Sequence, residues 1–180
     1  MADTSRTNPP SDFVTSWLTT LRASGLLPGR QALDVAMGRG RHALALARAG
    51  FRVFGVDIDH ASVADALRAA KSEGRAITVW CADLTSHPLP RAKFDIVVVT
   101  RYLQRDLFPA IRAATSRGGV VIYETFTTAQ RVHGTGPTGA DHLLEPGELL
   151  ERFQGFEVEF YEEVREPDAV ARIVARRRRS

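Results

Sequence analysis

Short apolar runs alternate with stretches of helical periodicity along most of the chain, and this alternation limits the possible folds more than any other feature. The apolar runs lie at 32–36, 52–56, 76–81, 94–99 and 120–124, and the helical stretches lie at 41–49, 62–72 and 107–115. A further helix, capped by Ser11 or Asp12 and ending near Gly25, is expected before the first run. Repeated units of strand, helix and strand form parallel sheets that are covered by helices. The sequence therefore predicts an α/β fold with a doubly wound, Rossmann-like sheet.

The last third of the chain has a different pattern. A segment rich in glycine and proline at 127–141 predicts a long mobile loop, of the kind that often serves as a lid. A short helical stretch at 146–153 precedes two alternating runs at 156–164 and 169–175, which predict an antiparallel pair. We therefore expect seven strands in the order 3-2-1-4-5-7-6, mostly parallel, with the last-numbered strand antiparallel to its neighbours.

The expected domain organisation follows from where this patterning starts and stops. Residues 1–10 lack apolar periodicity and are expected to form a flexible leader. Residues 11–175 are expected to form a single domain, which is an ordinary extent for a chain of 180 residues. Residues 176–180 are expected to form a basic tail.

Composition excludes several classes of protein. Hydrophobic residues make up 44% of the chain and charged residues 25%, as in ordinary globular proteins. No apolar run is long enough to span a bilayer and the first residues are too polar for a signal peptide, so no membrane association and a cytoplasmic location are expected. The single cysteine, Cys81, excludes an intrachain disulfide and a CxxC metal site, and no metal is expected.

The charge distribution argues against a nucleic-acid partner. The net charge is +3, but Arg176–Arg179 supply four positive charges, so the rest of the chain sums to −1. A nucleic-acid-binding fold would spread its basic residues over one face. Enzymes that modify an amino group of a flipped base carry an Asn-Pro-Pro-Tyr-like motif after the fourth strand. Here the fourth apolar run is followed by Thr100-Arg101-Tyr102. A small molecule is therefore the expected partner.

The first strand and helix are joined by a glycine-containing loop. Gly38 and Gly40 lie between a buried run and a helical stretch. Glycines at such a turn let the backbone approach a ligand, and the start of the helix offers free amides. The loop therefore predicts a site for a nucleotide-like cofactor.

Three acidic residues are expected to lie near this loop. Asp34 precedes it, Asp57 ends the next run, and Asp83 follows the third. The carboxyl ends of parallel strands share one edge of the sheet, so these side chains should converge on one pocket. The separation between Gly38 and Asp57 suits a carboxylate that accepts hydrogen bonds from a ribose.

Two classes of cofactor fit such a loop. Gly38-x-Gly40-x-x-Ala43 satisfies the dinucleotide fingerprint in its alanine-terminated form, which keeps an NAD(P)-dependent oxidoreductase open. Reductases of the short-chain type need a tyrosine and a lysine four residues apart, and none of the three tyrosines has a lysine at that spacing. The residues for hydride transfer are therefore not evident.

The other cofactor class is S-adenosylmethionine. The segment Asp34-Val35-Ala36-Met37-Gly38-Arg39-Gly40 resembles the first motif of the class I S-adenosylmethionine-dependent methyltransferases, with Ala36 in place of the first glycine. A methyl group is tolerated there if the backbone is not at positive φ. The resemblance covers about residues 31–175, and within the superfamily the chain is most similar to small methyltransferases of the tellurite and thiopurine type.

The resemblance implies S-adenosylmethionine as the cofactor and a set of binding residues. These are Asp34 at the start of the loop; Ala36, Gly38 and Gly40 against the methionine part; Asp57 at the ribose; Asp83 and Leu84 at the adenine; Ile58 on the adenine face; and Thr100 facing the methionine part.

Residues for the methyl acceptor are expected from loops over the same edge of the sheet. Arg101 and Tyr102 follow the fourth run, Glu124 ends the fifth, and His133 lies in the predicted loop. Arg101 can hold an anionic substrate or pair with Glu124, and His133 can reach the site or stay in solvent. Methyl transfer from a sulfonium needs a base only if the nucleophile is protonated, so no catalytic residue is assigned.

The predicted function is therefore the transfer of a methyl group from S-adenosylmethionine to a small-molecule acceptor. Two alternatives stay open. One is an NAD(P)-dependent oxidoreductase, and the other is a non-catalytic regulator or RNA-associated protein that retains the fold.

Overall fold

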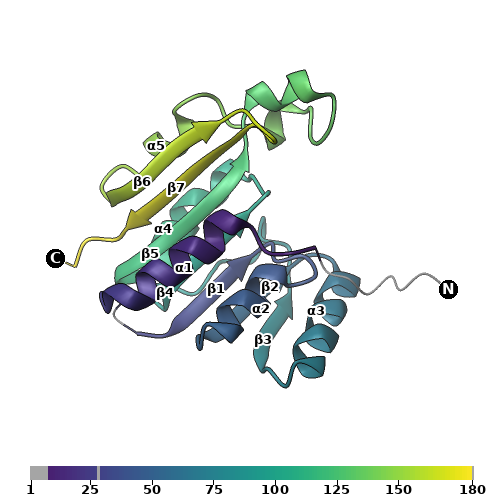
Figure 1. Cartoon of the computed structure of the whole chain (residues 1–180), viewed down its shortest axis with the longest axis vertical. Helices are drawn as coiled ribbons and strands as arrows, with labels where there is room; N and C mark the ends of the chain where they lie inside the picture. The colour runs from purple at the N-terminus through teal and green to yellow at the C-terminus, as the bar shows by residue number, and fades with distance from the viewer. Residues whose placement is uncertain (1–7, 28, 180) are drawn as a thin grey trace.

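The computed structural model of the chain describes residues 8–27 and 29–179, and these residues form one seven-stranded sheet with helices on both faces (Figure 1). The strands are β1 (Gln31–Val35), β2 (Arg52–Asp57), β3 (Ile77–Cys81), β4 (Phe94–Thr100), β5 (Thr115–Phe126), β6 (Glu157–Val164) and β7 (Val170–Arg176). The helices are α1 (Asp12–Ser24), α2 (Arg41–Arg48), α3 (His60–Ser72), α4 (Phe108–Ala114) and α5 (Glu148–Arg152), with short 3₁₀ helices at η1 (Arg105–Leu107), η2 (Thr128–His133) and η3 (Ala140–His142).

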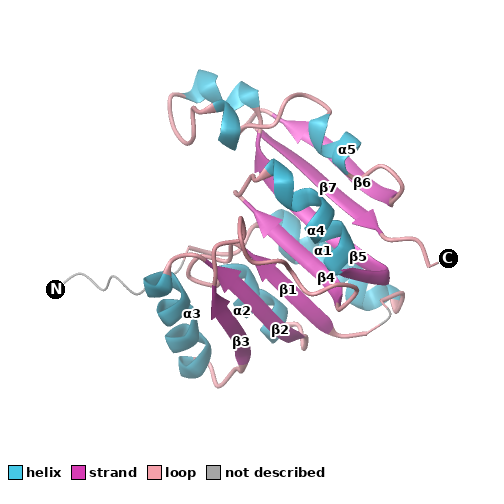
Figure 2. Ribbon diagram, turned by 180° about the vertical axis from the view of Figure 1, so that it is seen from behind, coloured by secondary structure: helices cyan, strands magenta, loops and turns pink. Residues whose placement is uncertain are grey.

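The predicted strand order is confirmed. The sheet runs β3-β2-β1-β4-β5-β7-β6, with β3 at one edge and β6 at the other (Figure 2). The first five strands are parallel, and β7 is antiparallel to both β5 and β6. The fold is therefore the doubly wound, mostly parallel α/β sheet that the sequence predicts.

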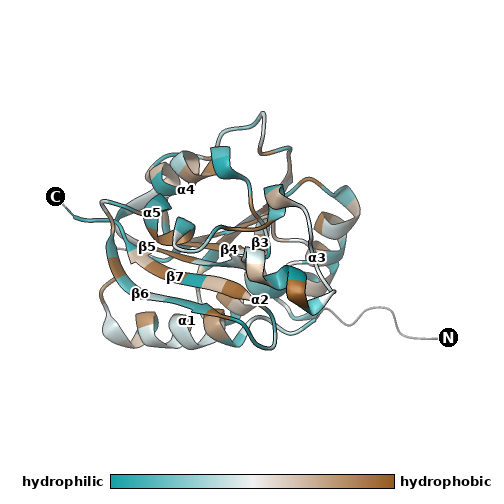
Figure 3. Ribbon diagram, turned by 90° about the horizontal axis from the view of Figure 1, so that it is seen from above, coloured by the Kyte–Doolittle hydropathy of each residue, from teal (hydrophilic) through white to brown (hydrophobic). Residues whose placement is uncertain are grey.

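The apolar pattern of each element explains the layers. In β4 every residue is buried, and its alternate side chains enter opposite cores: Val97 and Val99 face α4 and α5, whereas Ile96 and Val98 face α1, α2 and α3. A strand with helices on both sides is therefore apolar throughout. Figure 3 shows α4 and α5 on one side of the sheet and α1 and α2 on the other.

The segment after β5 differs from its prediction. Instead of one long mobile loop it contains η2 and η3, and the buried side chain of Gln130 holds it in place. Gln130 Nε2 donates to Thr135 O (3.0 Å), and Gln130 Oε1 accepts from Ala169 N (2.7 Å). The prediction was wrong because glycine and proline content does not report a hydrogen bond to a residue 39 positions away.

The ends of the domain also depart from the predicted bounds. β7 extends into the expected basic tail, since Arg176 is buried in the strand, donates to Gly118 O (2.8 Å) and pairs with Glu159. Arg177 donates to Thr115 O (2.6 Å), while Arg178 and Arg179 are exposed. Most of the predicted leader, residues 1–7, lies outside the described residues. Within the described part of the chain, every helix is too short or too polar to cross a bilayer.

Candidate functional site

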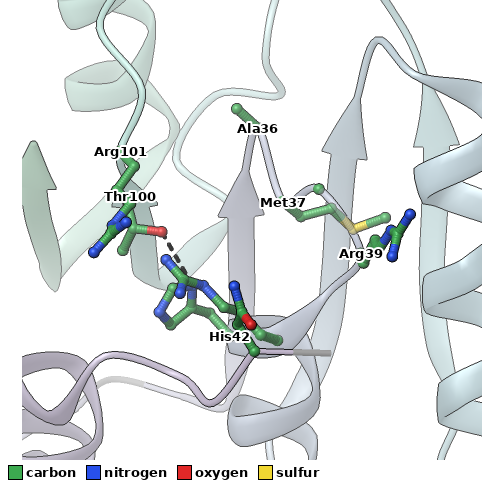
Figure 4. A pocket seen from close by; sticks show the side chains of 9 residues that line it. Ala36, Met37, Arg39, His42, Thr100 and Arg101 are labelled. Atoms are coloured by element: carbon green, nitrogen blue, oxygen red, sulfur yellow. Dashed lines mark hydrogen bonds between the residues drawn. The ribbon is translucent and has the colours of Figure 1, made fainter. Parts of the chain in front are cut away.

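Two adjoining cavities open at the carboxyl edge of the sheet. The larger cavity, of about 480 Å³, is lined by Asn8, Ala36, Met37, Gly38, Arg39, Arg41, His42, Thr100 and Arg101. The smaller cavity, of about 250 Å³, is lined by Ala36, Asp57, Ile58, Ala82, Asp83, Leu84, Arg101 and Tyr102. Ala36 and Arg101 line both, so the two cavities meet between the ends of β1 and β4. Figure 4 shows the larger cavity, with Thr100 and Arg101 on one side and the glycine loop on the other.

The glycine loop is shaped by backbone hydrogen bonds and by close packing. Met37 N donates to Val56 O (3.0 Å), which ties the loop to β2. Gly40 is the residue before α2 and has φ +78°, and a Cβ atom there would lie 2.8 Å from the Cβ of Ala66 in α3. Gly40 therefore lets the loop pack against α3, and it is not among the residues that line either cavity, unlike Gly38.

Ala36 has a positive φ of +52°. The sequence predicts that its methyl group is tolerated only if φ is not positive, and that condition is not met. A side chain in the left-handed region costs about 1–2 kcal/mol. Arg101, at the end of β4, is also at positive φ (+53°). Both residues lie where the two cavities meet, and strained backbone of this kind concentrates at binding sites.

Asp34 is buried at the end of β1, beneath the loop. Its Oδ2 accepts from Ala43 N in α2 (2.8 Å), whereas its Oδ1 has no hydrogen-bond partner among the described residues. Burial raises the pKa of this carboxyl group to about 7. A buried carboxylate oxygen without a partner is costly, and a cation or a water molecule would relieve that cost. Asp34 itself does not line either cavity.

The predicted ribose and adenine residues come together at the smaller cavity. Asp57 fixes the glycine loop, since its Oδ2 accepts from Gly38 N (2.7 Å). Asp83 accepts from the amide and the hydroxyl of Thr85 (2.9 and 2.7 Å), which lowers the pKa of its carboxyl group. Ile58 is 67% exposed at the same cavity. Two carboxylates and an exposed apolar side chain suit a ligand with both hydroxyl groups and an apolar ring.

His42 has a structural role in the wall of the larger cavity. Its Nε2 accepts from Ser11 N (3.1 Å), and its Nδ1 lies 3.0 Å from Thr100 Oγ1 (Figure 4). Burial, followed by the charges of Arg41 and Arg101, lowers the pKa of His42 to about 3. The neutral ring therefore carries its proton on Nδ1 and donates it to Thr100, because Nε2 is already an acceptor.

The expected acceptor-side residues separate into two groups. Arg101 and Tyr102 line the cavities. Glu124 is only 5% exposed and pairs with Arg172 (Nε to Oε2, 2.6 Å), so the alternative that Arg101 pairs with Glu124 is wrong.

Arg101 instead pairs with Asp168 (2.8 Å) and lies over the ring of Phe126. His133 ends η2 and lines neither cavity.

Three arginines and one asparagine also line the larger cavity, and of these Arg101 was predicted from the sequence. Arg39 and Arg41 flank Gly40, Arg101 follows Thr100, and Asn8 precedes α1. Arg39 and Arg41 were not predicted as site residues from the sequence. Their positions on either side of Gly40 in the glycine loop could have indicated them. Among the described residues, no cluster of histidine, cysteine and acidic side chains is arranged to hold a metal.

Known proteins resemble the chain in both sequence and fold. A family model described as "Methyltransferase domain" matches residues 32–119. A "Ubiquinone biosynthesis O-methyltransferase" from Methylococcus capsulatus is 29% identical over 132 residues, which is 69% of this chain and 55% of that protein. The chain therefore spans about half the length of this curated relative.

Solved methyltransferase structures share the fold. An S-adenosylmethionine-dependent methyltransferase from Clostridium acetobutylicum superposes with a TM-score of 0.76 at 13% identity, covering 95% of this chain and 93% of the other. TehB from Haemophilus influenzae superposes with a TM-score of 0.72 at 20% identity, covering 89% of this chain and 62% of the other. At these identities the likeness establishes the fold.

Proposed function

We propose that this chain is a class I S-adenosylmethionine-dependent methyltransferase and that it transfers the methyl group of S-adenosylmethionine to a small molecule. The observation that carries the proposal is the pair of adjoining cavities at the carboxyl edge of the sheet. Ligands of open parallel sheets bind at this edge.

The residues present fit this cofactor. In the smaller cavity Asp57 would accept from the ribose hydroxyl groups, and Ile58 and Leu84 would pack on the adenine beside Asp83. In the larger cavity the backbone of Ala36 and Gly38, with Thr100, would border the methionine part. Asp34 lines neither cavity, so its part would be indirect: its Oδ2 accepts from Ala43 N and holds the start of α2 beneath the loop. The bound cofactor supplies an activated methyl group on a sulfonium.

The chain's own contribution would be positioning. The loop and β4 would hold the two substrates against each other at the edge of the sheet. Because orientation alone can supply a large part of the rate of such a displacement, a base is not required.

A small-molecule acceptor is supported over nucleic acid. The larger cavity is of a size that admits a small ligand. Two of the four tail arginines, Arg176 and Arg177, are held by the sheet and by carbonyl oxygens, so the basic run is shorter than its sequence implies. An O-methyltransferase among the relatives also agrees with a small acceptor. We place the protein in the cytoplasm, which a single unpaired thiol fits.

Calorimetric titration with S-adenosylhomocysteine tests the proposal, with NAD(H) and NADP(H) titrated in parallel. We expect binding of S-adenosylhomocysteine alone. Asp57→Ala should weaken it by roughly 10- to 100-fold, which corresponds to about 1.5–3 kcal/mol for hydrogen bonds to a charged group. Asp12→Ala, an exposed acidic residue in the first turn of α1, is the matched control and should change nothing.

Each other outcome contradicts the proposal in a different way. Binding of a dinucleotide alone would favour an oxidoreductase. No binding of any of the three compounds, together with a salt-sensitive affinity for RNA, would favour a non-catalytic RNA-associated protein.

A further inference from the structure

We propose that the methyl acceptor is a small organic anion, and that Arg41, Arg101 and the hydroxyl group of Thr100 hold its anionic group in the larger cavity. This inference rests on the proposed methyltransferase function. It adds the charge of the acceptor and the residues that recognise it.

The larger cavity is lined by cations and has no acidic side chain among the described residues that line it. Arg39 pairs with Asp65 and Arg101 with Asp168, but no carboxylate among residues 8–27 and 29–179 lies within ion-pair distance of Arg41. Arg41 is half-buried, and among the described residues its guanidinium donates one hydrogen bond, to the carbonyl oxygen of Pro9 at 3.4 Å. Burial and the nearby charge of Arg101 lower the pKa of Arg41. An anion between Arg41 and Arg101 would offset both the burial of the Arg41 charge and its repulsion by Arg101.

Thr100 adds a neutral donor to the same wall. Its hydroxyl oxygen accepts the Nδ1 proton of His42, because Nε2 of that ring is occupied by the amide of Ser11. The hydroxyl proton of Thr100 has no acceptor among the described residues. Thr100 lines the cavity and is therefore set to donate into it.

The size and charge of the cavity separate the acceptor from the cofactor. The larger cavity has about twice the volume of the smaller one, although the methionine part has fewer atoms than the adenosine part. The remaining space suits a small acceptor. The methionine carboxylate is already balanced by its own ammonium group, and the sulfonium adds a positive charge. Of the two guanidinium groups beside it, that of Arg101 pairs with Asp168, whereas that of Arg41 would still lack an anion at ion-pair distance among the described residues.

An anionic acceptor also fits the absence of a proton acceptor among the described lining residues. The one histidine has both ring nitrogens engaged, and the remaining side chains are arginine, threonine, asparagine, alanine, methionine and glycine. An ionised oxygen or sulfur of the acceptor would form the new bond to the methyl carbon with its own electron pair. The carbon–sulfur bond of the sulfonium would break, with its electron pair retained on sulfur. Charge and atoms balance without any proton being removed.

Calorimetric titration of the S-adenosylhomocysteine complex with benzoate and with benzamide, its neutral counterpart, tests this inference. We expect benzoate to bind at least about tenfold more tightly than benzamide. Arg41→Gln and Arg101→Gln should each weaken benzoate binding by about tenfold or more. Arg68→Gln is the matched control, because this arginine is 72% exposed, pairs with Asp65 and lines neither cavity. It should change the affinity less than about twofold.

Three results would overturn the inference while S-adenosylhomocysteine still binds and the proposed function stands. Benzoate and benzamide could bind equally, benzoate could fail to bind, or Arg68→Gln could weaken binding as much as Arg41→Gln. A further titration uses the complex with 5′-methylthioadenosine, which lacks the amino-acid part. Benzoate binding to that complex alone would assign the arginines to the methionine carboxylate and would also overturn the inference. Failure to bind S-adenosylhomocysteine would instead refute the proposed function itself.

Discussion

At the scale of single residues, Ala36 holds a backbone conformation that costs free energy in the folded chain, with φ at +52°. Ala36→Gly removes this strain of about 1–2 kcal/mol, but it gives the unfolded chain more freedom, worth about 0.4–1 kcal/mol. We expect a net stabilisation of about 0.5–1 kcal/mol in urea unfolding. Ala92→Gly, at φ +47° and outside the cavities, is the control and should stabilise similarly. A destabilised Ala36→Gly variant would show that the methyl group is needed for packing.

Two buried ionisable residues give opposite contributions to the pH dependence of stability. The pKa of Asp34 rises from 3.8 to about 7, so the folded state binds the extra proton and loses stability as pH rises through this range. The pKa of His42 falls from 6.5 to about 3, so the folded state lacks a proton and loses stability as pH falls below 6.5. Between about pH 4 and 6.5 the two contributions oppose each other.

Asp34→Asn removes one of these contributions and exposes the other. Relative to the native chain, we expect the variant to be more stable at pH 8 and to lose that advantage as pH falls through 7 towards 4. The slope of the difference should approach about 1.4 kcal/mol per pH unit. Denaturant unfolding at a series of pH values measures it, with Asp12→Asn as the exposed control. A pH-independent difference between variant and native chain would mean that Asp34 is ionised throughout.

The identities of the key acidic residues were predictable at this scale, but their partners were not. Asp34, Asp57 and Asp83 could be assigned to one edge because parallel strands end together. The pairing of Glu124 with Arg172 depends on the register between β5 and β7, in which these residues lie opposite each other. Nothing local in the sequence specifies that register, because β7 joins the sheet from 44 residues beyond the end of β5.

At the scale of elements, the segment between β5 and α5 depends on Gln130, which bridges Thr135 and the start of β7. Gln130→Ala leaves a buried amide of Ala169 without its acceptor, at a cost of about 1–3 kcal/mol. We expect hydrogen exchange of the amides at 127–144 to accelerate correspondingly, while those of β4 remain protected. Arg131→Ala, which removes only an exposed bond to Thr138 O, is the control. Unchanged exchange in Gln130→Ala would show that η2 and η3 are held by their own packing.

The elements themselves were predictable where periodicity is strong. The apolar runs predicted all seven strands and the periodic stretches all five helices, because a strand buried on two faces and an amphipathic helix have distinct patterns. The start of β5 was predicted at residue 120 because glycines at 118 and 119 usually end or begin elements. The strand instead begins at Thr115, since an irregularity in its pairing with β4 accommodates both glycines.

At the scale of the whole molecule, we propose that residues 11–175 unfold as one unit, although the family model matches only 32–119. β6 and β7 continue the same sheet, and Phe160 in β6 packs against Trp17 of α1, with ring centroids 5.7 Å apart. Trp80 lies in β3, at the opposite edge of the sheet. The two tryptophans therefore report on the two ends of the fold.

Single-tryptophan variants, Trp17→Phe and Trp80→Phe, test this cooperativity. In thermal unfolding, the tryptophan fluorescence of each variant and its far-UV circular dichroism should give the same midpoint temperature. S-adenosylhomocysteine at about 100 times its Kd should stabilise the fold by about 2.7 kcal/mol, which raises both midpoints together by roughly 5–10 °C. If only the Trp80 midpoint moved, β6 and β7 would be a separate unit. A shared shift requires that a ligand bound between β1, β2 and β4 also stabilises the contact of α1 with β6, although Trp17 and Phe160 line neither of the two site cavities.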